Sequence, residues 1–541
     1  MSSTPSVNSA VAQKGAHPLV DDDVAAASDS KQASSGVWAV GASSPAFEPI
    51  PEYEGRHRYD PKATWSEQEE KKLVRRLDYR ICSWVCLMFF SLQLDRGNIT
   101  QALSDQMLGD LGLTTNQYNY GMTIFYVCFL CAELPSQMLS KKFGPDRWVP
   151  IQIVAWSIVA ICQCLMKGEK GYYATRALLG LIEGGFIPDA ILYLSYFYTS
   201  KELPIRLSYF YCASNGTSII AAFLAFGILH LRGVGGWEGW RWLFAIEGAV
   251  TALIGVASWF YLPPGPTQTA GGLRGKDGWF TEREEVIMVN RILRDDPSKG
   301  GMHNRQGLTL GMLWSALCDF DLWPIYLYGF TLLIPAQPVT AYITINLRTL
   351  GFDTFQTNLL TIPAYVLFLV QLIFWTRFSE RFNNRMFTVF LYSVWVFPLL
   401  MALELLPSGA SPWSWYALSA LLVGYPYVHS ILVALTSRNA GSVRTRTCGS
   451  AVYNMTVQTS SIIASNIYRA DDAPNYRRGN KVLLGIVAWN AVFAWVIKAY
   501  YMWRNKKREA IWNSMTQEEK DVYSTTTKDE GSKRLDFRFA H

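Results

Sequence analysis

Long apolar stretches separated by short polar segments recur along the chain from residue 81 to residue 502. Each stretch is close to the ~20 residues that a tilted α-helix needs to cross the hydrocarbon core of a bilayer. The pattern therefore predicts twelve transmembrane helices, at 81–94, 118–139, 149–166, 172–197, 207–229, 242–262, 323–342, 359–375, 386–406, 415–435, 448–467 and 482–502.

The polar segments indicate how the chain is divided. A long hydrophilic segment, 265–310, separates two sets of six helices, which we expect to form two halves, 65–264 and 311–503. The Ser-, Ala-, Gly- and Pro-rich segment 1–64 predicts a disordered N-terminal tail, and 504–541 is a C-terminal tail. The predicted fold class is an all-α membrane protein of twelve helices in two six-helix halves.

The composition supports a membrane protein and excludes several functions. Half of the residues are apolar and 17% are charged, so a soluble domain would have too little polar surface to cover its apolar groups. No Ser-His-Asp, HExxH or phosphate-loop pattern is present, so the sequence does not predict an enzyme. Cys128 and Cys131 form a CxxC inside an apolar helix, without a second pair or a nearby His. We therefore expect no metal site and no cofactor.

Basic residues in the loops predict the orientation. Lys and Arg are about twice as frequent in the segments on one side of the predicted helices, which include 265–310, as on the other. Positively charged loops stay in the cytoplasm, so we expect both termini there. The outer loop YRADDAPNYRRGNK does not follow the rule. The net charge of +6 reflects this loop bias, so we infer no nucleic-acid partner from it.

Two charged residues interrupt the fourth apolar stretch. Arg176 and Glu183 are seven residues apart, which places them on the same face of a helix. An ionisable group in hydrocarbon costs at least ~2.5–3.5 kcal/mol, so such groups are kept mostly for a function. The pair predicts a substrate or proton site, and the alternative is a structural ion pair that joins this helix to a neighbour.

Four segments carry a family resemblance. SLQLDRGNIT lies at the end of the first predicted helix, ELPSQMLSKKFGPDRWVP extends across the second and third, RALLGLIEGGFIPDAILYLSYFYTSKE covers the fourth, and NIYRADDAPNYRRGN lies before the last. In this order they resemble the fungal allantoate-permease-like transporters of the major facilitator superfamily, in its anion:cation symporter branch. The resemblance extends from about Asp78 to Arg504. It implies a monomeric plasma-membrane carrier that takes up a small organic anion, driven by a proton gradient.

The resemblance also implies roles for individual residues. Arg96 and Arg176 match the two arginines of the family that bear on substrate, and a guanidinium presents a fork that matches a carboxylate. Glu183 matches the acid of the fourth-helix motif, and burial favours the protonated form of a carboxyl group, as proton coupling requires. Glu133 is a second candidate for proton coupling or an ion-pair partner. Asp95 is a third, and its alternative roles are to neutralise Arg96 or to hold the helix end.

Further residues complete the predicted site. Asn346, Asn454 and Gln458 are polar groups on helices of the second half, where they contribute either to a substrate pocket or to contacts between helices. The gating element predicted from SKKFGPDRW contains Lys142, Asp146 and Arg147. Three other residues are unusual at membrane depth: Pro335 and Pro338 interrupt the seventh helix, and His429 either titrates or bonds a neighbouring helix.

Two other functions fit the predicted fold. One is proton-coupled export of a small molecule, although the fifth helix, YCASNGTSIIAAFLAFGIL, lacks the Gly-Pro-Gly-rich pattern of the antiporters. The other is a nutrient sensor, which often carries a longer cytoplasmic tail than 504–541. The sequence does not name the substrate: allantoate or ureidosuccinate, vitamin-like carboxylates, small peptides and sulfur-containing anions are handled by similar chains.

Overall fold

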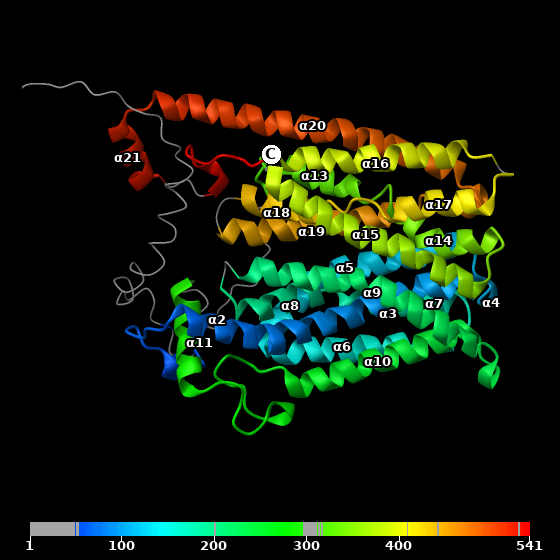
Figure 1. The fold of residues 1–541 in the computed structure, drawn as a ribbon, viewed down its shortest axis with the longest axis horizontal. Coiled ribbons are helices and arrows are strands. Elements are labelled where there is room, and N and C mark those ends of the chain that lie inside the picture. The colour runs from blue at the N-terminus through cyan, green and yellow to red at the C-terminus, as the bar shows by residue number, and fades with distance from the viewer. Residues whose placement is uncertain are drawn as a thin grey trace, which may run out of the picture.

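The computed structural model is helical, and Figure 1 shows its helices running side by side. It describes residues 49, 53–199, 202–295, 311, 314, 317–382, 384–407, 409–440, 443–527 and 531–541. Within these residues no β-strand is present. We refer to the two ends of the bundle by the helices that lie there, as the α11 end and the α4 end (Figure 1).

The first group of helices lies in the lower part of Figure 1. It consists of α2 (Glu67–Leu77), α3 (Ser83–Ser104), α4 (Met107–Asp110), α5 (Thr115–Phe143), α6 (Pro145–Cys162), α7 (Glu169–Glu183), α8 (Phe186–Ser195), α9 (Leu203–Ile228) and α10 (Gly239–Tyr261). Helix α11 (Glu282–Asp295) follows at the end of the bundle.

The second group lies above it in the same view. It consists of α13 (Trp323–Leu332), α14 (Gln337–Thr349), α15 (Thr354–Phe382), α16 (Arg385–Leu405), α17 (Pro412–Val423), α18 (His429–Asn439), α19 (Val443–Ala464) and α20 (Arg477–Ser514), with α21 (Gln517–Thr526) beyond it. The predicted interruption at Pro335 and Pro338 is present, because α13 ends at Leu332 and α14 begins only at Gln337.

Nine helical segments of the described chain are long and apolar enough to cross a membrane. The other three predicted spans correspond to α3, to the α17–α18 pair and to α19. Helix α3 contains charged residues, α17 and α18 are each short, and α19 begins with arginines and is rich in Ser and Thr. The twelve predicted spans are thus consistent with the structure, and nine of them also meet the hydropathy criterion there.

Helices pack mainly within each group. In the first group α10 packs on α6, α7 on α5 and α9 on α3, whereas in the second α16 packs on α20 and α13 on α19. The groups meet where α9 contacts α15, α5 contacts α19 and α3 contacts α14. The exact limits 65–264 and 311–503 stay a prediction, and residues 296–310 of the predicted central segment lie outside the described residues.

Ion pairs hold α2 and α11 together at the α11 end. Arg76 of α2 pairs with Glu284 at 2.7 Å, and Arg291 of α11 contacts Glu70 at 3.3 Å. Hydrogen bonds from Arg283 and from the backbone of Ser66 lower the pKa of Glu69 to about 2. Most of the predicted N-terminal tail lies outside the described residues. Its last part, residues 53–64, contacts α11, although composition assigned it to a disordered tail.

Candidate functional site

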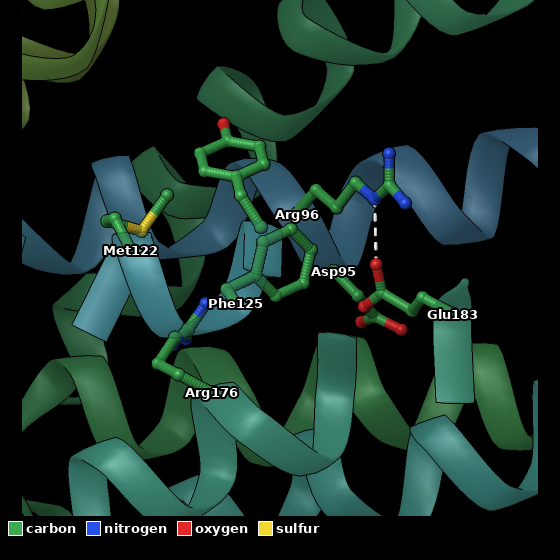
Figure 2. Close-up of a pocket in the computed structure, with 7 residues that line it drawn as sticks. Asp95, Arg96, Met122, Phe125, Arg176 and Glu183 are labelled. Carbon is green, nitrogen blue, oxygen red and sulfur yellow. Dashed lines mark hydrogen bonds and ion pairs between the residues drawn. The ribbon is translucent and has the colours of Figure 1, made fainter. Parts of the chain in front are cut away.

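A cavity in the middle of the first group is lined by residues of α3, α5 and α7. Figure 2 shows side chains of both charges around it. Its lining residues are Asp95, Arg96, Met122, Phe125, Tyr126, Arg176 and Glu183. Four of these were predicted as site residues from the sequence, so the fold brings Asp95, Arg96, Arg176 and Glu183 together.

Glycines explain why Glu183 lies where it does. The fourth predicted span is not one helix: α7 ends at Glu183, and α8 begins at Phe186. Gly185 has φ +99°, a backbone conformation that favours glycine. A Cβ at Gly184 would lie 2.7 Å from the backbone oxygen of Phe129 in α5. The expectation of one continuous helix is therefore wrong, because close packing against α5 needs a break at this point. The break leaves the Glu183 carboxylate at the end of a helix.

Arg96 is the ion-pair partner of Glu183. Its Nε donates to Oε2 of Glu183 at 2.7 Å, the dashed line in Figure 2. The Glu183 side chain is 1% exposed and that of Arg96 is 22% exposed, so the cation reaches the cavity while the anion is buried. The guanidinium also lies 4.8 Å from the ring centre of Phe129, in a cation–π contact. A pair that joins α3 to α7 is thus present.

Arg176 takes a different partner. Its Nη2 donates to Oε1 of Gln163, and its guanidinium lies 5.6 Å from the ring centre of Tyr172. The residue is 2% exposed. Within the part of the chain that the structure describes, no carboxylate pairs directly with Arg176, so its guanidinium is left without a counter-ion in contact beside the cavity.

Asp95 performs neither of the two structural roles considered for it. Its Oδ2 accepts a hydrogen bond from Nε1 of Trp156 at 3.2 Å, on α6, and Arg96 is instead neutralised by Glu183. Helix α3 continues to Ser104, so Asp95 does not hold a helix end. It therefore lies inside the helix, with one oxygen bound to a neutral donor.

Each of the two arginines beside the cavity has a nitrogen without a partner within the described part of the chain. Nη2 of Arg96 and Nε of Arg176 are both buried and make no hydrogen bond there. A buried donor left without an acceptor costs roughly 1–3 kcal/mol, and more when it is charged. Acceptors that meet both donors would remove this cost, and the oxygens of a carboxylate have the required geometry.

Other predicted site residues lie outside the cavity. Glu133 of α5 is buried nearer the α11 end, within electrostatic range of Asp189, which accepts a hydrogen bond from a serine of α5. Asn346 in α14 is half-buried, as are Asn454 and Gln458 in α19. The structure does not bring these residues to the arginines in this conformation.

The predicted gating residues lie at the turn between α5 and α6. Lys142 and Arg147 are exposed there, and Asp146 is half-buried in the first turn of α6. Gly144 between them has φ +85°. The turn is at the α11 end, away from the cavity (Figure 1).

Sequence reasoning missed several neighbours of the site. Tyr126 lines the cavity, and its hydroxyl accepts from Nε2 of Gln337 at 3.2 Å, at the start of α14. Gln163, the partner of Arg176, was missed because a single glutamine near the end of an apolar stretch gives no motif. His429, another unusual residue, contacts the hydroxyl of Tyr453 in α19 at 3.2 Å.

Hydrogen bonds between the two groups gather between the cavity and the α4 end. Asn119 of α5 is 1% exposed; its Nδ2 donates to the backbone oxygen of Tyr468 at 2.6 Å, and its Oδ1 accepts from the Tyr342 hydroxyl. Asn466 donates to Thr123 at 2.8 Å nearby. These contacts close the α4 end over the cavity.

Comparisons with known proteins agree with this architecture. Residues 85–465 match the family model described as the Major Facilitator Superfamily. The chain is 48% identical to the Uncharacterized transporter YIL166C of Saccharomyces cerevisiae, over 90% of each chain. It is 26% identical to the Uncharacterized transporter C1039.04 of Schizosaccharomyces pombe, over 81% of this chain and 84% of that protein.

A solved structure shares the fold. It is a bacterial homologue of the human lysosomal transporter Spinster, in an inward-facing and occupied conformation. The TM-score is 0.57 at 13% identity, and the match covers 80% of this chain and 98% of that one.

Proposed function

Because the chain belongs to the major facilitator superfamily, we propose that it couples the uptake of a small organic anion to the entry of protons. It is a multi-pass membrane transporter and not an enzyme. The substrate classes are those of the allantoate-permease-like family: allantoate or ureidosuccinate, vitamin-like carboxylates and sulfur-containing anions.

The observation that carries the proposal is the pair of arginines beside one cavity. Arg96 and Arg176 each keep a guanidinium nitrogen without a partner among the described residues, and both line the cavity. Among the described residues, the Glu183 carboxylate pairs directly with Arg96, and no carboxylate pairs directly with Arg176. The unused guanidinium donors favour an anionic solute, and its small size follows from the side chains that enclose the site.

The Arg96–Glu183 pair supplies a way to couple anion and proton. When a proton binds Oε2 of Glu183, the carboxyl loses its charge and the ion pair with Nε of Arg96 is broken. Arg96 is then free to bind the anion with all its donors. Release of the proton would restore the pair, and Glu183 would compete with the anion for Arg96. Anion and proton therefore bind together in this scheme.

The remaining features of the proposal concern the cell. We place the protein in the plasma membrane as a monomer, with both termini and the α11 end in the cytoplasm. The basic loops support this orientation, since the segment that contains α11 is among the positively charged ones. The α4 end, where the hydrogen bonds of Asn119 join the two groups, then faces outward.

Uptake of labelled anions tests the proposal. Cells that lack their own carriers would express the chain and receive a panel from the substrate classes above. We expect at least one anion to accumulate, faster as external pH falls, and to stop accumulating when a protonophore is added. Accumulation that is indifferent to both treatments would contradict proton coupling. Faster loss of a preloaded anion, without uptake, would instead identify an exporter.

A further inference from the structure

A second buried polar cluster lies between α3 and α10. Asp95 and Asn98 are three residues apart on α3, and Glu247 and Thr251 are four apart on α10, so each pair occupies one helix face. The two helices pack against each other. All four residues are at most 1% exposed. Of these four residues, only Asp95 was predicted as a site residue, and Glu247 belongs to no motif.

The oxygens of this cluster lack partners. Several polar atoms make no hydrogen bond within the described chain. They are both carboxylate oxygens of Glu247, Oδ1 of Asp95, both polar atoms of the Asn98 amide and the Thr251 hydroxyl. Asn98 faces Glu247, and Thr251 faces Asp95, near enough to interact electrostatically but outside hydrogen-bond geometry. Burying so many polar atoms unpaired is unfavourable, so the arrangement is incomplete without a ligand.

Among the described residues, no cation pairs with Glu247. The charged group that faces it is Asp95, another carboxylate. Beyond Asp95 lies Glu183, which is paired with Arg96. On α6, the partner of Asp95 is Trp156, whose uncharged indole N–H donates a hydrogen bond to the carboxylate.

Helices α6 and α9, which pack on both α3 and α10, bring no positive charge to this point among their described residues. Charges on α6 are Asp146 and Arg147, in its first turn, and α9 carries only Arg206, also in its first turn. Two ionised carboxylates that face each other in hydrocarbon repel strongly, because the dielectric there is low. Charge balance therefore requires one positive charge from outside the protein.

We propose that Asp95 and Glu247, with Asn98 and Thr251, form a buried site between α3 and α10 that holds one exchangeable monovalent cation. The shared chemistry is a single positive charge bound by carboxyl oxygens, which both a proton and Na⁺ supply. A proton would form the O–H of one carboxyl and be donated to the other. Na⁺ would take oxygen ligands from all four side chains.

The site adjoins the anion cavity, because Asp95 also lines that cavity. Asp95 and Arg96 are adjacent on α3, so they point in directions about 100° apart. Asp95 interacts electrostatically with Glu247 on one side and with Glu183 on the other. A change of charge at the α3–α10 site is therefore felt at the Arg96–Glu183 pair. Only this coupling role rests on the proposed function, since cation binding itself does not require an anion.

Carbodiimide labelling of the unmodified protein tests the site. N,N′-dicyclohexylcarbodiimide reacts with protonated carboxyl groups in apolar surroundings, and mass spectrometry locates the adduct. The full chain in detergent would be treated from about pH 5 to about pH 9, in Na⁺ or in K⁺. We expect Glu247 or Asp95 to be modified at low pH, with a yield that falls roughly tenfold per pH unit above the midpoint.

The cations distinguish the two arms of this experiment. If Na⁺ lowers the yield at fixed pH and K⁺ does not, the site binds Na⁺. If the yield falls as pH rises and is the same in Na⁺ and in K⁺, the site binds a proton. A yield at both residues that is the same at every pH and in both salts, including no modification at all, would overturn the proposal.

A variant gives a second readout. The unfolding temperature of the wild-type protein should fall as pH rises through the titration of the site, because the folded state loses its bound proton. Glu247→Gln should abolish this pH dependence of the unfolding temperature. Glu509→Gln, an exposed residue on α20, is the matched control. A Glu247→Gln profile identical to wild type would overturn the proposal.

If Glu247→Gln does not fold, Thr251→Val should shift the labelling midpoint, and an unshifted midpoint counts against the site. Neither assay uses an anion or a gradient, so the site can stand even if uptake is not proton-coupled.

Discussion

At the scale of single residues, the arrangement of Arg176 makes a specific prediction about anion binding. Arg176→Lys keeps the charge but loses the planar fork and its free Nε donor. One charge-assisted hydrogen bond is worth roughly 1.5–3 kcal/mol, so we expect apparent affinity to fall about tenfold or more. The measurement is the concentration dependence of uptake for the anion that accumulates fastest in the panel.

A matched control separates this effect from a general loss of protein. Arg478→Lys changes an exposed arginine at the start of α20 that pairs with Asp471, and uptake should be unaffected. Surface expression of both variants would be compared. An affinity of Arg176→Lys equal to that of wild type would restrict Arg176 to its contact with Gln163, leaving Arg96 as the anion-binding candidate.

At the scale of elements, hydropathy and local contacts determine different parts of the molecule. The positions of the spans follow from apolar stretches, because only a helix satisfies the backbone in hydrocarbon, and the sequence carries that information locally. The break at Pro335 and Pro338 is local too, since proline disrupts helices wherever it occurs. The break after Glu183 is different, because it depends on how closely α7 and α8 approach α5.

The pairing of the charged residues could not be predicted from the local sequence either. Arg96 and Glu183 are 87 residues apart, and their pairing requires α3 and α7 to be neighbours. The motifs identified both residues but did not show which cation meets which anion. Glu247 was missed altogether, since a lone acid in an apolar stretch gains its meaning only from the facing α3.

The C-terminal segment 531–541 leads to a prediction at this scale. Phe539 is 2% exposed, its ring lies 5.1 Å from that of Tyr501, and Asn505 bonds both its backbone N–H and its C=O at 2.8 Å. Phe539→Ala removes the buried ring, so we expect the segment to leave α20 and its amide hydrogens to exchange faster. Hydrogen exchange with mass spectrometry measures this. Arg538→Ala, at an exposed neighbour, should leave exchange unchanged, and slow exchange in Phe539→Ala would show that the ring does not hold the segment.

At the scale of the whole molecule, transport requires the closed α4 end to open. Asn119 joins the two groups there through one hydrogen bond to each of two residues of the second group, Tyr468 and Tyr342. Asn119→Ala removes both bonds and leaves the cavity residues in place. Each bond contributes roughly 0.5–1.5 kcal/mol, so we expect the ratio of open to closed molecules at the α4 end to rise about tenfold.

Spin labels on either side of this end measure that ratio. In a cysteine-free background, Val234→Cys and Ser414→Cys place labels on exposed residues of the first and second groups. Pulsed electron paramagnetic resonance gives the distribution of distances between them. We expect a longer-distance population to grow in Asn119→Ala and not in Asn513→Ala, an exposed asparagine on α20.

Since the anion would enter from this side in the proposed orientation, uptake at low anion concentration should change with that population. A distance distribution unchanged by Asn119→Ala would mean that the remaining contacts, such as Asn466 to Thr123, are sufficient to hold the end closed.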